Sequence, residues 1–189
     1  MLKASEILVD NYGAVLSDAS RSAIDGLAER KVYGRHSLIL DAGQVSKCFY
    51  LLDEGMVRLF YYKDGRDVTE HFVADGELMY CIESLFLEQP TELLIEAIED
   101  TALYEIDYVR FTGLCDSNVE IGRLGRRLLE IDLVISQRKA DAWRFESAKE
   151  KYLRFLKDYP EAAKRASVSQ IATYLFMTPE TLSRVRAEI

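Results

Sequence analysis

Glycine divides this chain into two parts with different backbone requirements. All ten glycines lie at or before Gly125, and the last 64 residues contain none. Between Gly34 and Gly76 a glycine recurs about every ten residues, and the intervening stretches are rich in Val, Ile, Leu, Phe and Tyr. Short apolar segments at this spacing, separated by turn residues, predict an antiparallel β-sandwich or barrel.

The β-rich part has recognisable strands and one clear hairpin. Asp64-Gly65 supplies the positive φ angles of a tight hairpin turn. Ile24, Leu27 and Ala28 repeat at helical spacing, so short helices are expected ahead of the sheet. The expected strands are Ser37–Leu40, Cys48–Leu52, Met56–Tyr62, Thr69–Val73, Glu92–Ile98 and Ala102–Ile106.

A heptad stripe of apolar residues marks a long helix after the sheet. Ser117 is the expected N-cap, with Glu120 completing a capping box. Such a helix packs on its own β domain or on a second copy of the chain. Leu129, Leu133 and Val134 widen the apolar face, so the helix can do both, and a homodimer is expected. The predicted dimer residues are Ile121, Leu124, Leu128, Ile131 and Ile135.

Three short helices are expected in the last part of the chain. The first is Ser147–Tyr159, the second begins after Ser167 or Ser169, and Thr178 caps the third with Pro179 at its first position. Two short helices joined by a tight connection and preceded by another helix match a helix-turn-helix.

The third of these helices has an outward face suited to reading DNA. With Leu182 and Val185 facing inward, Arg184 can pair with guanine and Glu180 can accept from cytosine. An ordinary solvated face of a terminal helix would look the same. The candidate DNA-contacting residues are Ser169, Gln170, Thr178, Glu180, Thr181, Ser183, Arg184 and Arg186.

Four stretches together resemble the Crp/Fnr-type bacterial transcription regulators. Residues 168–186 are similar to the family's helix-turn-helix and 147–160 to the helix before it. Residues 43–62 and 96–106 resemble its cyclic-nucleotide-binding β-roll. The resemblance implies an α+β fold: a jelly-roll-like antiparallel β-roll with flanking helices, a long dimerisation helix and a C-terminal helix-turn-helix. The expected domains are 1–116 (sensory β-roll), 117–145 (dimerisation helix) and 146–189 (DNA-binding domain).

The resemblance also implies a function and partners. The expected protein is a cytoplasmic, sequence-specific transcription regulator and not an enzyme, with double-stranded DNA and a second copy as partners and RNA polymerase as a further candidate. The alternative is a regulator-like protein that has lost DNA binding and acts through protein contacts.

The DNA-reading segment departs from the family pattern at three places. The family's base-contacting Glu and Arg fall on Glu180 and Arg184, but Pro179 replaces an arginine often found before that Glu. Phe176 replaces the glycine common in the turn, which is strained if its φ is positive. The sequence ends three residues after Arg186, so the family's β-wing is expected to be absent.

The ligand pocket departs further. The family's phosphate cassette pairs a Gly-Glu with a Pro-Arg-x-Ala about ten residues on, whereas here Pro90 is followed by Thr91 and Glu92. Burying a phosphodiester without that arginine costs several kcal/mol, so neither cAMP nor cGMP is expected to bind. The remaining cavity is either collapsed or takes an unknown effector; its candidate residues are Tyr80, Cys81, Glu83, Ser84, Thr91 and Glu92.

The cysteines and histidines of the sequence do not form the pattern of a metal or redox site. Cys48, Cys81 and Cys115 are too far apart for an iron–sulfur cluster, and reduced thiols fit a cytosolic protein. His36 and His71 do not make the clustered ligands that a cupin-like enzyme needs, so no metal, cofactor or catalytic residue is expected. No leader or long apolar run is present, so no membrane association is expected.

The net charge of −8 argues against DNA until it is divided along the chain. Residues 1–116 hold 10 Lys and Arg against 22 Asp and Glu, whereas residues 117–189 hold 14 against 10. The acidity therefore belongs to the sensory part. A small positive surplus in the other part predicts modest DNA affinity that falls as salt rises.

Overall fold

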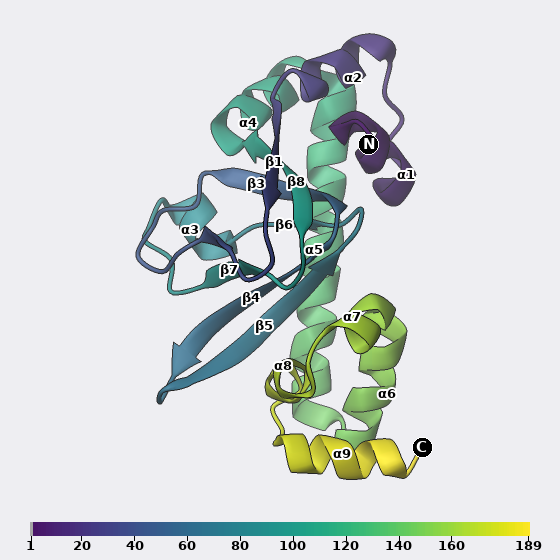
Figure 1. Ribbon diagram of the computed structural model, residues 1–189. Coiled ribbons are helices and arrows are strands. Elements are labelled where there is room, and N and C mark those ends of the chain that lie inside the picture. The colour runs from purple at the N-terminus through teal and green to yellow at the C-terminus, as the bar shows by residue number, and fades with distance from the viewer. Residues whose placement is uncertain (1) are drawn as a thin grey trace.

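A β-roll, a long helix and a small helical domain follow one another in the chain. The computed structural model describes residues 2–189, without the side chain of residue 143. The long helix runs beside the roll and continues past it to the helical domain (Figure 1). The expected α+β class is confirmed. In the described part of the chain, no helix is both long and apolar enough to cross a membrane.

Two short helices precede the first strand. They are α1 (Ala4–Tyr12) and α2 (Asp18–Asp25), as the helical spacing predicts. The helical spacing itself is wrong beyond Ile24, because Leu27 follows the end of α2 and Ala28 begins β1 (Ala28–Tyr33). Every residue of β1 pairs with β8 (Thr101–Asp107). Because β1 forms by pairing with a strand about 70 residues away in the chain, its own residues show no clear strand pattern.

The β-roll consists of two four-stranded antiparallel sheets, ordered β1-β8-β3-β6 and β2-β7-β4-β5. All six expected strands form, and the short β6 and the helix α3 (Ile82–Leu87) were not expected. The remaining strands are β2 (Leu38–Leu40), β3 (Cys48–Glu54), β4 (Met56–Lys63), β5 (Arg66–Ala74), β6 (Leu78–Met79) and β7 (Leu94–Ala97).

Two turns explain where glycine is required. The β4–β5 hairpin turns at Asp64 and Gly65, with φ angles of 52° and 74°, as the sequence predicts. At Gly55, between β3 and β4, φ is 110° and a Cβ atom would lie 2.5 Å from Oγ1 of Thr101. Only glycine fits this close approach of two turns.

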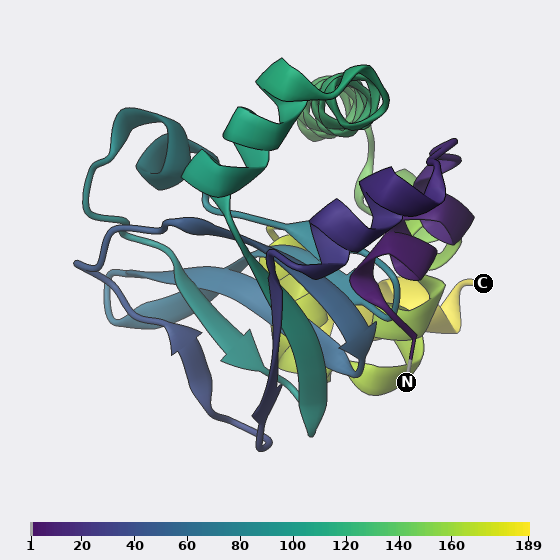
Figure 2. The same cartoon turned by 90° about the horizontal axis from the view of Figure 1, so that it is seen from above.

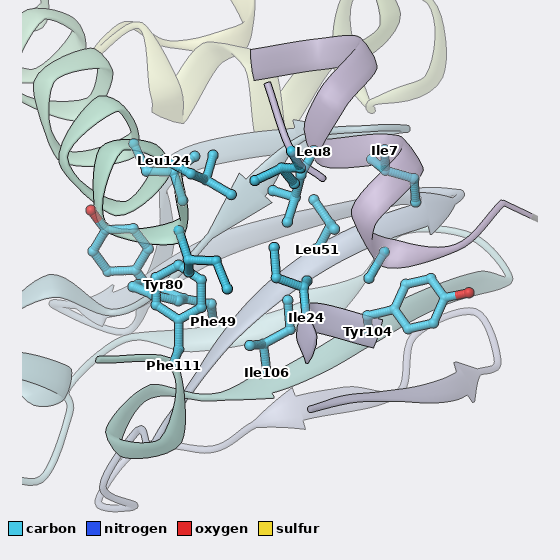
Figure 3. Packing of buried hydrophobic residues seen from close by; sticks show 14 of the residues in the cluster. Ile7, Leu8, Ile24, Phe49, Leu51, Tyr80, Tyr104, Ile106, Phe111 and Leu124 are labelled. Carbon is cyan, nitrogen blue, oxygen red and sulfur yellow. The ribbon is translucent and has the colours of Figure 1, made fainter. Parts of the chain in front are cut away.

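The core has two layers in the β-roll. Leu52, Val57 and Leu103 are among the residues buried between the two sheets. On the outer face of the first sheet, Phe49 and Leu51 point toward side chains from α1, α2 and the long helix (Figure 3). Figure 2 shows the N-terminal helices and the long helix on the same side of this sheet.

The long helix is α5 (Val119–Phe145), preceded by the unexpected α4 (Tyr108–Ser117). Ser117 is therefore the last residue of α4, and its predicted role as N-cap is wrong. Asn118 caps α5 instead, accepting hydrogen bonds from the backbone N–H groups of Glu120 and Ile121 at 2.9 and 3.2 Å. Glu120 reaches back to α2, where its carboxylate accepts from Ser17 and Ser20.

The heptad stripe of α5 faces its own chain. Ile121, Leu124 and Leu128 are buried in the core beneath α1 and the first sheet. In the monomer these three predicted dimer residues are thus unavailable to a second copy. Ile131 and Ile135 line a cavity under the same face of the helix. The exposed apolar face of α5 holds Leu129, Leu133 and Val134, exposed by 47%, 72% and 47%.

Four helices complete the chain, one more than the sequence predicts. They are α6 (Ala148–Asp158), α7 (Pro160–Arg165), α8 (Val168–Tyr174) and α9 (Pro179–Ala187). Ser147, Ser167 and Thr178 cap α6, α8 and α9. Pro160 follows α6 as expected, but it also occupies the first position of α7, where its missing N–H is tolerated.

Candidate nucleic-acid interface and effector pocket

Helices α8 and α9 are joined by a short turn and held by local caps and a shared core. The Thr178 hydroxyl accepts a hydrogen bond from the backbone N–H of Thr181 at 3.2 Å and so starts α9. Leu182 and Val185 are buried against α6 and α8, as their spacing predicts. This packing fixes which face of α9 is left outside.

The outward face of α9 presents one acidic and one basic side chain that can form hydrogen bonds with base edges. Glu180, Ser183 and Arg184 are exposed, and so is Ser169 at the start of α8. Hydrogen bonds from its own backbone N–H and from the Thr178 hydroxyl lower the pKa of Glu180. An ionised Glu180 is an acceptor, whereas Arg184 is a donor fork, so the two offer complementary contacts.

The other predicted contact residues are engaged within the domain. The Gln170 side chain accepts from the backbone N–H of Ser167 at 2.9 Å, and the Thr178 and Thr181 hydroxyls lie 3.2 Å apart. Nε of Arg186 donates to the Tyr152 hydroxyl at 3.0 Å, and the guanidinium lies over that ring. No pattern in the sequence predicts this Arg186–Tyr152 contact, because the two residues lie 34 positions apart.

The turn before α9 carries backbone strain. Phe176 has a φ angle of 55° and is 53% exposed. A left-handed backbone is unfavourable for a residue with a Cβ atom. The φ angle at Phe176 is positive, so the phenylalanine that replaces the family's glycine is strained, as the sequence comparison predicts.

The helical domain is docked on the outer face of the second sheet. Met56, Phe72 and Ile98 from the roll belong to the same apolar core as the helices of this domain. The backbone N–H of Thr69 donates to Oγ1 of Thr173 on α8 at 3.2 Å. No pattern in the sequence predicts this contact between β5 and α8, whose bonded residues lie 104 positions apart.

Polar contacts reinforce the docking. Arg165 of α7 forms ion pairs with Asp75, at 2.9 Å, and with Glu99. Nδ1 of His71 lies 3.2 Å from the Tyr159 hydroxyl. Burial lowers the pKa of His71 to about 3, with a further contribution from the nearby Lys139, so this imidazole is neutral at physiological pH.

Five of the six predicted effector residues line one groove of the β-roll. Cys81, Glu83, Ser84, Thr91 and Glu92 surround a cavity of about 370 Å³. Tyr80 is the exception, because its hydroxyl donates to Asp132 of α5 at 2.9 Å and it lines other cavities. In the described part of the chain, no lysine or arginine lines this groove.

The cysteines are free thiols rather than reactive thiolates. Burial raises the pKa of Cys48 and of Cys81 to about 11, and it also raises the pKa of Cys115. Within the described residues, no cluster of three or more His, Cys, Asp or Glu side chains could hold a metal ion.

Comparison with known proteins relates the roll to a protein family and the overall fold to solved structures. Residues 30–118 match the cyclic nucleotide-binding domain family. FixK2 from Bradyrhizobium japonicum is similar in structure, with a TM-score of 0.72 and 20% identity over 85% of this chain and 83% of that one. The catabolite activator protein of Thermus thermophilus gives 0.58 and 22% over 96% and 85%. A search of curated proteins finds no significant match.

A third neighbour has the same arrangement. The c-di-GMP-responsive global regulator CLP of Xanthomonas campestris gives a TM-score of 0.64 and 19% identity over 91% of both chains. At these identities the likeness establishes a shared fold. The chain thus has a roll that matches the cyclic nucleotide-binding domain family, and it shares its overall fold with these three regulators.

Proposed function

We propose that this protein is a homodimeric, sequence-specific DNA-binding transcription regulator of the Crp/Fnr type. The observation that carries the proposal is the outward face of α9, where Glu180, Ser183 and Arg184 are exposed beside a buried Leu182 and Val185. The N-terminal end of such a helix reads base edges in the major groove. The fold shared with FixK2 and the catabolite activator protein supports this assignment.

The proposal includes partners beyond DNA. A second copy would join along the exposed face of α5, and two α9 helices would then enter successive major grooves about 34 Å apart. RNA polymerase is a further candidate partner, and the proposed setting is the cytoplasm. The three domains would act as sensor, dimerisation helix and DNA reader.

Selection from random double-stranded oligonucleotides with the purified protein tests this function. Enrichment of an inverted repeat with half-sites about one helical turn apart is expected. No enrichment would refute DNA reading and favour the alternative, a regulator-like protein that acts through protein contacts. Two observations favour this alternative: Pro179 at the start of α9 and the strained backbone of Phe176.

We further propose that the effector is not a cyclic nucleotide. Among the residues that the structure describes, no Lys or Arg lines the groove with Glu83, Thr91 and Glu92 to neutralise a phosphodiester, and the two carboxylates lie beside it. Removing a phosphate charge from water without a partner costs several kcal/mol.

Titration calorimetry with cAMP should therefore detect no binding. Micromolar affinity would contradict this prediction. A Thr91→Arg variant supplies the missing cation at the matching position, so gain of cAMP binding in that variant alone would support the stated reason.

A further inference from the structure

A cavity of about 410 Å³ lies where the β-roll, α5 and the helix-turn-helix domain meet, outside the groove described above. One wall comes from α1 and the turn before β6, with Tyr12 and Glu77. The opposite wall comes from the DNA-binding domain, with Arg154, Tyr159 and Tyr174. A molecule in this space would touch the sensory and the DNA-reading parts at once.

Helix α5 forms the side of the cavity through the second half of its heptad stripe. Ile131, Ile135 and Arg138 continue the line of Leu128, at the spacing of one helix face. The stripe is buried in a core through Leu128, and from Ile131 onward it faces open space. An arginine at the heptad position after Ile135 therefore borders a cavity rather than a core.

The carboxylates around the cavity already have partners. Asp132 accepts from Tyr80 at 2.9 Å, and Asp158 lies 3.5 Å from Arg154. Glu77 accepts from the backbone N–H of Ala74 at 2.8 Å.

The cations around the cavity do not all have partners. Arg154 donates to Glu146 at 2.9 Å, and Lys139 forms an ion pair with Glu70. Arg138 is exposed and makes no hydrogen bond or ion pair with the residues that the structure describes. One guanidinium fork therefore remains to receive a negative charge, and a carboxylate matches its geometry.

The walls favour a flat apolar body attached to that charge. Four tyrosines line the cavity: Tyr12, Tyr80, Tyr159 and Tyr174. Aromatic rings offer large contact areas, and a volume near 400 Å³ is within the usual range of small-molecule sites.

We propose that this cavity binds a small aromatic monocarboxylate, with Arg138 as its carboxylate partner. The site lies between domains, so its occupancy would change how the helix-turn-helix domain docks on β5. The binding step stands by itself, whereas its effect on DNA rests on the proposed function.

Calorimetry and ligand-observed NMR on the full chain, without DNA, test the site with benzoate, 4-hydroxybenzoate and indole-3-acetate. At least one should bind with a Kd below about 1 mM. Arg138→Gln should weaken that binding about tenfold or more, because it removes a charged hydrogen-bonding partner. Arg127→Gln is the matched control, since it removes the same charge from an exposed position of α5 away from the cavity.

Ile135→Trp adds bulk to the cavity wall while keeping the Arg138 charge, and it should abolish binding. Absence of binding by all three acids at millimolar concentration would overturn the proposal. Equal effects of the Arg138 and Arg127 substitutions, or unchanged affinity in the Ile135 variant, would also overturn it. If an acid binds as expected and the protein selects no DNA, the site stands and the proposed function fails.

Discussion

Arg184 is the exposed α9 side chain best suited to a guanine edge, and its loss gives a direct prediction at the scale of one residue. Arg184→Ala should weaken binding to the selected DNA by roughly 1–3 kcal/mol and relax base choice at one position. Fluorescence anisotropy with the selected site and with single-base variants measures both effects. Lys157→Ala, which removes a charge from α6, should leave base choice intact. Unchanged affinity in the Arg184 variant would remove α9 as the reading helix.

Phe176 gives a second prediction at this scale, because its φ of 55° is costly for any residue with a Cβ atom. Phe176→Gly should raise the free energy of unfolding by about 0.5–1 kcal/mol, the relieved strain being partly offset by the freedom of glycine in the unfolded chain. Chemical denaturation measures the change. Phe176→Ala removes the ring but keeps the Cβ atom, so it should not stabilise. If both variants behave alike, backbone strain is not the cause.

Single residues also show what the sequence could reveal about local structure. Thr178, Ser147 and Ser167 cap their helices through hydrogen bonds that span three residues. The sequence predicts the Thr178 cap and leaves Ser167 and Ser169 as alternatives for α8. Ser117 and Asn118 are both good cap residues. Only the packing of α4 against α5 decided between them.

At the scale of elements, Glu120 joins α5 to α2 by hydrogen bonds from Ser17 and Ser20. These bonds lower the pKa of Glu120 from 4.5 to about 2. The folded state therefore gains stability from the ionised carboxylate above about pH 4.5, and that gain is lost as the pH falls toward 2.

Glu120→Gln should accordingly lower Tm at neutral pH, and the difference from the parent protein should shrink between pH 4.5 and 2. Thermal unfolding across this range measures it. Glu130→Gln removes a carboxylate from an exposed pair with Arg126 and should show little difference at any pH. A pH-independent difference for Glu120→Gln would contradict the stated cause.

Elements differ in how far the sequence predicts them. The β4–β5 hairpin is visible because two adjacent residues define its turn. Strand β1 and the two-residue β6 are not, because each exists only through pairing with a distant strand. The candidate effector residues fall between these cases: five of them line one groove, but the sequence cannot show that Tyr80 turns toward α5.

At the scale of the whole molecule, the exposed face of α5 predicts how two copies would associate. Leu133→Asp places a charge at a leucine that is 72% exposed and should convert a dimer to monomers, as measured by sedimentation. Val109→Asp, at a valine of α4 that is 71% exposed, is the matched control and should leave the dimer intact. A Leu133→Asp variant that remains dimeric would exclude this face as the interface.

The docking of the helical domain is also a property of the whole molecule. Phe72 of β5 lies in one aromatic cluster with Phe155 and Tyr174, and Arg165 adds ion pairs to two turns of the roll. The two halves therefore share a core. Movement of one relative to the other requires these contacts to change.

The sequence by itself determined the strands with local turns, the short helices near the end of the chain, the Thr178 cap and the opposite charges of the two halves. These depend on residues close together in the chain or on composition. Tertiary structure decided what the stripe of α5 faces, because helical spacing shows which residues share a face but not what lies opposite. It also decided the docking on β5 and the cavity beside Arg138, since both require segments that are distant in the sequence to meet.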